Sequence, residues 1–182
     1  MTLLLAVAAG LLLGLGEGTL RGLAPEAPNL LAAALAVVLC DVGSQRSRPQ
    51  RSTRAMGASF VGLLLGYSAC SLEPANVFLL GGGIAAVALT AARRVLFVES
   101  VLAQAAFGLA AFAALWLSRE LHAGLGLAPR LSWRPDGWMT PLLTALATPI
   151  LVRAWVELRR VARWGADRAG ELRDATGRPP PA

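Results

Sequence analysis

Two side chains with potential chemistry lie close together, Ser118 and the single histidine of the chain, His122. A serine beside a histidine suggests nucleophilic catalysis, in which the imidazole takes the hydroxyl proton. That chemistry also needs a third group to orient the imidazole, or a nucleophile elbow around the serine, and the sequence offers neither. The carboxylates are scattered over both sides of the expected membrane. We therefore predict no catalytic residue, and that the protein is not an enzyme.

The two cysteines, Cys40 and Cys70, each lie inside an apolar run. Neither belongs to a Cys-x-x-Cys pair or has a histidine nearby, as metal ligands usually do. A single histidine also excludes a bis-histidine haem. We predict no metal and no cofactor.

The composition is that of a membrane protein. Of the 182 residues, 55% are hydrophobic and only 15% are charged, and the mean hydropathy is +0.58. A soluble domain carries about 25% charged residues and has to bury most of its apolar surface. The 17 basic residues are all arginines, and they fall in the gaps between apolar runs. This pattern favours a membrane topology with lipid as a partner, and it disfavours nucleic acid.

Six apolar runs predict an all-α polytopic membrane bundle of about six transmembrane helices. The runs cover residues 2–20, 28–43, 55–72, 76–92, 95–118 and 138–156. They are continuous and rich in Ala and Leu, without the period-2 alternation of a membrane barrel. We expect a transmembrane domain over 1–156 and a basic, cytoplasmic, partly disordered tail over 157–182. The segment 119–137 is expected to be an outer loop that holds His122.

The arginines orient the predicted bundle. With the N-terminus inside, thirteen of them fall in inner segments and four in outer ones. The inner set is Arg46, Arg48, Arg51, Arg54, Arg93, Arg94, Arg153, Arg159, Arg160, Arg163, Arg168, Arg173 and Arg178, and the outer set is Arg21, Arg119, Arg130 and Arg134. Cytoplasmic loops of membrane proteins carry such an excess. Both termini are therefore expected in the cytoplasm. Cys40 and Cys70 then differ in depth by roughly 20 Å, so both should be free thiols.

Small residues recur every four positions within the predicted spans. The candidates for helix packing or partner docking are Ala58, Gly62 and Gly66 in the third span and Gly81, Gly82 and Gly83 in the fourth. Such residues let helix backbones approach closely in lipid. The third-span stripe packs either within the bundle or against a membrane helix of a partner. The glycine triplet indicates a kink or a close contact, or else an unwound segment that binds a solute.

Among the ionisable residues, Glu99 is the deepest candidate for a functional site, about one turn into the fifth span. Arg93 and Arg94 lie near enough to form an ion pair with it at the inner interface. Pairing is the favoured interpretation, and a substrate or proton site is the alternative. The basic tail either lies on the inner leaflet, held by anionic lipid, or serves only as a topology anchor.

Several segments resemble those of one known family. Phe60–Gly66, followed by the Ser71–Pro74 turn, is similar to the F-x-x-G-L-L-x-D segment and turn of the rod-shape-determining MreD family, with Gly66 where that family usually has Asp. Arg93–Glu99, with Gln104 beyond, is similar to its arginine pair and next span. Thr144–Pro149 before Arg153 resembles its closing helix. The resemblance covers roughly residues 25–160.

The resemblance implies a helical bundle like that of the substrate-binding subunits of energy-coupling-factor vitamin transporters. It implies a non-enzymatic protein of the bacterial inner membrane that binds the single-span protein MreC. A glycan polymerase and a transpeptidase of cell-wall elongation would be its neighbours. The alternative function is a vitamin-type substrate-binding subunit of a transporter, with an outward cavity near Glu73, Asn76, Trp133 and Trp138.

Overall fold

The structure is a computed structural model that describes residues 3–24, 26–44, 49–70, 75–92, 100–127 and 135–175. In these ranges the chain is helical, with six α-helices and a short 3-10 turn. The elements are α1 Leu3–Leu23, α2 Leu30–Ser44, α3 Pro49–Ala69, α4 Ala75–Ala92, α5 Val101–Gly124, the turn Pro135–Trp138 and α6 Met139–Ala175. The all-α prediction is confirmed.

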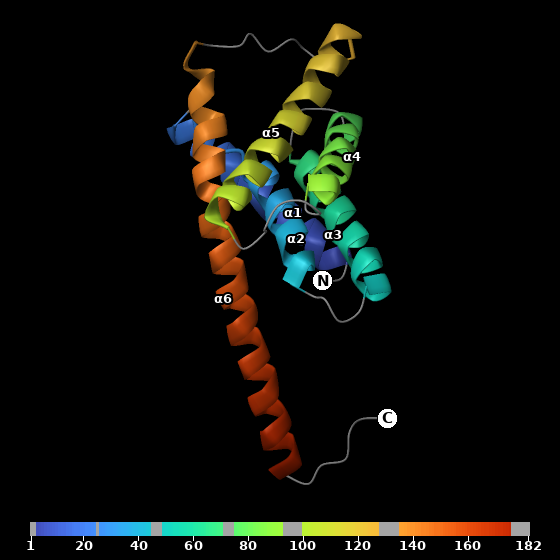
Figure 1. The fold of residues 1–182 in the computed structure, drawn as a ribbon, viewed down its shortest axis with the longest axis vertical. Helices are drawn as coiled ribbons and strands as arrows, with labels where there is room; N and C mark the ends of the chain where they lie inside the picture. Colours follow the sequence, from blue (N-terminus) through green and yellow to red (C-terminus); the bar gives the residue numbers. More distant parts are fainter. Residues whose placement is uncertain are drawn as a thin grey trace.

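Helix α2 lies at the centre of the bundle, and each of the other five helices contacts it (Figure 1). Most of its described side chains are buried, including Leu31, Leu35 and Leu39, which have no exposed surface, and one stripe with Ala34 and Val38 is half-buried. A helix that is apolar on every face has to be enclosed by protein or by lipid. Here protein covers most of it.

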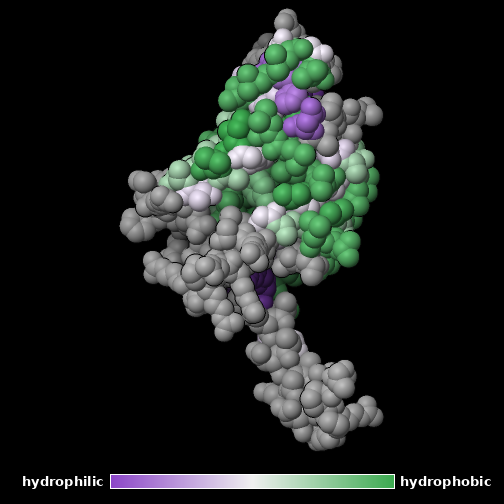
Figure 2. All heavy atoms as spheres, turned by 90° about the vertical axis from the view of Figure 1, so that its right-hand side faces the viewer, coloured by the Kyte–Doolittle hydropathy of each residue, from purple (hydrophilic) through white to green (hydrophobic). Residues whose placement is uncertain are grey.

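The outer surface of the bundle is hydrophobic. Helices α1, α4, α5 and α6 all expose large apolar side chains, and leucines such as Leu4, Leu23 and Leu102 are 81% exposed. Figure 2 shows one face of the bundle, on which hydrophobic residues predominate among those that are coloured. Water-soluble monomers rarely expose an apolar area larger than a few hundred Å². Three helical segments are long and apolar enough to cross a membrane, namely Leu3–Leu23, Val101–Gly124 and Met139–Val161. The coarser prediction of a helical membrane protein is thereby supported.

The three other helices have shorter apolar segments, Leu30–Cys40, Gly57–Ala69 and Asn76–Ala92. The 15 residues of α2 extend about 22 Å, less than the roughly 30 Å of a hydrocarbon core. A helix in contact with lipid would meet this mismatch by thinning the bilayer or by flanking residues that snorkel. Because protein covers most of α2, its ends need acceptors and donors from neighbouring helices instead.

Two predicted boundaries are wrong. Helix α3 begins at Pro49 rather than near residue 55, because proline is favoured in the first helical turn, where its missing N–H would have no helical partner. Helix α5 continues to Gly124, so part of the predicted 119–137 loop, including His122, is helical. The helix ends in a Schellman motif, in which Leu127 N–H donates to His122 O at 2.8 Å and Gly126 adopts a φ of 73°.

Helix α6 is the longest element and continues well past the predicted span end at residue 156. Its 37 residues include Pro149 and much of the charged tail. In Figure 1 its C-terminal half extends below the other helices. The remaining tail residues, 176–182, lie outside the described part of the chain.

Neither cysteine forms a disulfide, and Cys40 is buried whereas Cys70 is exposed just after the end of α3. If α3 ends on the outer side of the membrane, a membrane-impermeant maleimide added to intact cells should label Cys70. Cys40 should react only after denaturation, because the packed core shields its thiol. Labelling is measured by a gel shift.

The Cys70→Ser variant is the control and should remove the signal from intact cells. Labelling of Cys70 in inverted membrane vesicles alone would contradict the predicted orientation.

Candidate functional site

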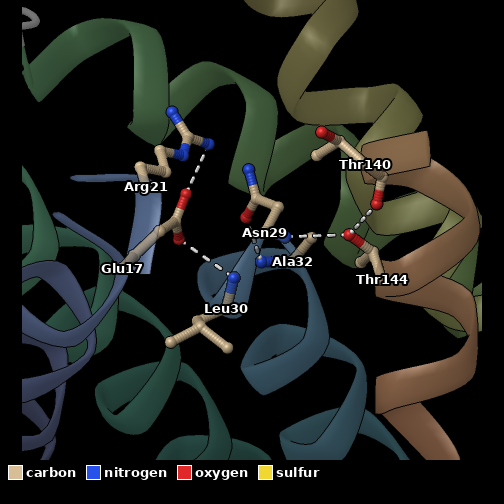
Figure 3. Close-up of polar contacts among 7 residues, drawn as sticks. All are labelled: Glu17, Arg21, Asn29, Leu30, Ala32, Thr140 and Thr144. Atoms are coloured by element: carbon tan, nitrogen blue, oxygen red, sulfur yellow. Dashed lines mark hydrogen bonds and ion pairs between the residues drawn. The ribbon is translucent and has the colours of Figure 1, made fainter. Parts of the chain in front are cut away.

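The most extensive polar contacts that the structure describes surround the N-terminus of α2 (Figure 3). Asn29 is the N-cap of this helix, and its Oδ1 accepts a hydrogen bond of 2.8 Å from the N–H of Ala32. Asparagine is among the residues that best satisfy the free donors of a first turn. The two neighbouring N–H groups, of Asn29 and Leu30, bind side chains from other helices.

Glu17 of α1 supplies one of these side chains. Its Oε2 accepts a hydrogen bond of 2.9 Å from the N–H of Leu30, and the residue is 1% exposed. Its Oε1 lies 2.5 Å from Nη2 of Arg21, one turn further along α1. This contact is an ion pair without hydrogen-bond geometry, since Oε1 has no hydrogen-bond partner. A carboxylate at this place also interacts favourably with the positive end of the α2 dipole.

Thr144 of α6 supplies the second side chain. Its hydroxyl accepts a hydrogen bond of 2.9 Å from the N–H of Asn29 and donates one of 2.7 Å to Thr140 O. Thr144 and Thr148 have no exposed surface, and Thr148 in turn donates to Thr144 O. The polar junction, meaning Glu17, Arg21, Asn29, Thr140 and Thr144, therefore joins α1, α2 and α6.

Ser118 and His122 are buried together, but their hydrogen bonds are not those of a catalytic pair. The Ser118 hydroxyl donates to Val77 O of α4 at 2.6 Å, so its proton is directed away from the imidazole. Nδ1 of His122 lies 2.8 Å from Ser118 O, the backbone carbonyl one turn earlier. This arrangement ties α5 to α4.

Glycines of α1 and α3 form the closest helix contact in the described bundle. Gly62 and Gly66 face α1, where a Cβ on Gly62 would lie 2.6 Å from Ala6 Cβ and one on Gly66 would meet Val7 O. Gly10 of α1 faces the α3 backbone in the same way, and Ala58, one turn before Gly62, is half-buried. The face of α3 considered for partner docking is therefore covered by the protein's own first helix.

The three consecutive glycines of α4 have three different surroundings. A Cβ on Gly81 would lie 2.9 Å from Leu115 Cα of α5, and one on Gly82 would lie 2.5 Å from Leu64 Cδ1 of α3. Gly83 points outward and has no neighbour within 4 Å. All three lie within the continuous helix Ala75–Ala92, so the segment is wound rather than unwound.

Several predicted residues lie outside the described ranges. These are Arg93, Arg94 and Glu99 of the proposed inner ion pair, and Glu73 and Trp133 of the alternative solute cavity. The two other cavity candidates are described. Asn76 accepts a 3.1 Å bond from the N–H of Val77, and Trp138 is 57% exposed.

The sequence interpretation missed Glu17, the only fully buried carboxylate in the described part of the chain. The sequence contains a signal for Glu17, because this acid lies within an apolar run and four residues before Arg21. An ionisable residue within a span is by default a candidate for a functional role. Its hydrogen bond to Leu30, however, depends on how the chain turns between α1 and α2.

No protein-family model matches the chain, and no curated protein or solved structure shows significant similarity to it.

The glycine contacts predict that replacing glycine by alanine lowers the stability of the protein by different amounts at different positions. Gly66→Ala should lower the thermal stability of the purified protein, because the new methyl would meet the backbone of Val7 and Leu11. Overpacking of this kind costs about 1–3 kcal/mol, or roughly 3–10 °C in Tm for a chain of this size. Thermal unfolding in mild detergent measures the change.

Gly83→Ala is the matched control, since nothing lies within 4 Å of that position. It should be neutral or slightly stabilising, because alanine favours helix. An equal loss of stability in both variants would contradict the α1–α3 contact.

Glu17→Ala should destabilise the protein by about 1–3 kcal/mol, because the half-buried N–H of Leu30 loses its acceptor. Glu17→Gln should cost less, since the amide oxygen still accepts from Leu30. Chemical or thermal unfolding in detergent provides the measurement.

Thr19→Ala is the control on the exposed side of α1, where the hydroxyl bonds only to Leu15 O. It should change stability by less than about 0.5 kcal/mol. If Glu17→Ala lowers the free energy of unfolding as little as this control does, the carboxylate does not hold α2 in place.

Proposed function

We propose that the protein is a non-enzymatic scaffold of the bacterial cell-shape machinery, a six-crossing protein of the inner membrane that is similar to the MreD family. Its partner would be an MreC-like protein with a single membrane span, close to the enzymes of cell-wall elongation. The sequence resemblance over residues 25–160 motivates the family. The observation that carries the scaffold role is the use of buried polar groups to join helices.

Each of these groups is directed at the chain itself. Glu17 and Thr144 bind the N-terminus of α2, and Ser118 binds the backbone of α4. In a membrane such contacts hold helices together, because lipid offers no alternative partners for polar groups. A protein built for binding a solute would direct such groups at the solute.

The exposed surface supports the same proposal. Because α1 covers the glycine face of α3, a partner's membrane helix would have to use another lipid-facing surface. Large apolar side chains are available there on α1, α4, α5 and α6. The three shorter apolar helices would cross the bilayer because protein contacts satisfy the polar groups at their ends. The N-terminus of α2 is an example, where Glu17 and Thr144 accept hydrogen bonds from its backbone.

Purification from bacterial membranes in mild detergent tests this function. The tagged full chain should recover an MreC-like protein together with a glycan polymerase or a transpeptidase of elongation. Mass spectrometry identifies the recovered proteins. An unrelated polytopic protein with the same tag controls for nonspecific recovery.

Recovery of the chain alone at every expression level would contradict the proposal. A large increase in Tm on adding one vitamin of a screened set would instead favour the transporter subunit, because a tight ligand stabilises the state that binds it.

A further inference from the structure

The segment of α6 from Arg153 to Arg168, at the end of its apolar span and just beyond it, combines exposed apolar and basic side chains. Val156, Leu158 and Val161 are each at least half exposed, and Trp164 is 58% exposed. The arginines of this stretch are Arg153, Arg159, Arg160, Arg163 and Arg168, and its acids are Glu157 and Asp167. Its net charge is therefore positive.

The depth of this segment follows from the apolar span of α6, which runs from Met139 to Val161. Beyond the hydrocarbon core, the headgroup layer is about 5–7 Å thick on each side, or four to five residues of helix. If α6 crosses the bilayer, Trp164 lies in this layer. Tryptophan is enriched at that depth.

Two arginine side chains reach back toward the membrane. The guanidinium of Arg168 lies 4.0 Å from the centre of the Trp164 ring, one turn nearer to the bilayer than its own backbone. Nη1 of Arg160 lies 3.1 Å from Glu157 Oε2, also toward the start of the helix. Helical side chains lean in this direction. The Arg168 charge is thereby held in the headgroup layer, and the Arg160 charge lies at the boundary between this layer and the hydrocarbon core.

We propose that this segment binds the phosphate of anionic phospholipids of the inner leaflet, with Trp164, Arg168 and Arg160 as the contact residues. The proposal rests on the inner placement of the α6 end, which is part of the proposed function, and it does not depend on the partner. Helix α6 needs no bend for this contact, because Arg160 lies at the end of the apolar span and Trp164 and Arg168 lie within the first two turns beyond it.

A second copy of α6 fits this surface less well. Two copies in one membrane would run parallel, which would bring the positively charged segments of the two helices together. Like charges at such short distances repel. An anionic headgroup is instead attracted by the arginines of this segment.

Native mass spectrometry of the full chain in mild detergent tests the proposal, with dioleoyl-phosphatidylglycerol and dioleoyl-phosphatidylcholine as probes. The wild type should bind the anionic lipid more tightly. Arg160→Gln with Arg168→Gln should weaken that binding by about fivefold per arginine, equivalent to about 1 kcal/mol each. Affinity for the zwitterionic lipid should not change, and inorganic phosphate at equal concentration should not compete.

Arg173→Gln with Arg178→Gln is the matched control, because it removes the same charge further along the tail. It should stay within twofold of the wild type, and thermal unfolding should show that both double variants are folded. Equal affinity of the wild type for the two lipids, or equal losses in both double variants, would overturn the proposal. So would loss of a co-purified protein in the Arg160/Arg168 variant without a change in lipid affinity. If the wild type binds anionic lipid selectively but recovers no partner in the purification experiment, the proposed partner is contradicted and the lipid proposal stands.

Discussion

The fold depends on how the first turn of α2 is satisfied. This helix is short and protein covers most of it, so its free N–H groups need acceptors within the bundle, and each buried donor without an acceptor costs about 1–3 kcal/mol. The acceptors come from three places: Asn29 at the cap, Glu17 on α1 and Thr144 on α6. The bundle can therefore contain a helix too short to cross the bilayer on its own.

A second constraint is the close approach of backbones at glycine. Gly10, Gly62 and Gly66 let α1 and α3 meet without intervening side chains, and Gly108 lets α5 approach Thr144 and Thr148 of α6. Such contacts gain dispersion energy where lipid provides no hydrophobic drive between helices. The two kinds of contact thus have different effects on the bundle. The polar junction fixes the N-terminal end of α2, and the glycine contacts fix the distances between the helices around it.

The sequence was informative about which elements exist and less so about their ends. Apolar runs predicted each of the six α-helices, because hydrophobicity determines what is buried in protein or lipid. Polar and charged stretches predict loops at Pro49 and Gly124, yet both residues are helical, because proline starts helices well and α5 ends only at Gly126. Glu17 was overlooked because its acceptor role arises only when the turn between α1 and α2 brings Leu30 to it.

One helix carries both Thr144 at the polar junction and the charged segment around Trp164. At about 1.5 Å per residue, Ala175 lies about 46 Å from Thr144 along the axis. A tilt of about 10° about Thr144 would therefore move that far end sideways by about 8 Å. Because α6 is held near its N-terminus by Thr144, small rearrangements where it meets α1 and α2 would become large displacements at the opposite end of the helix.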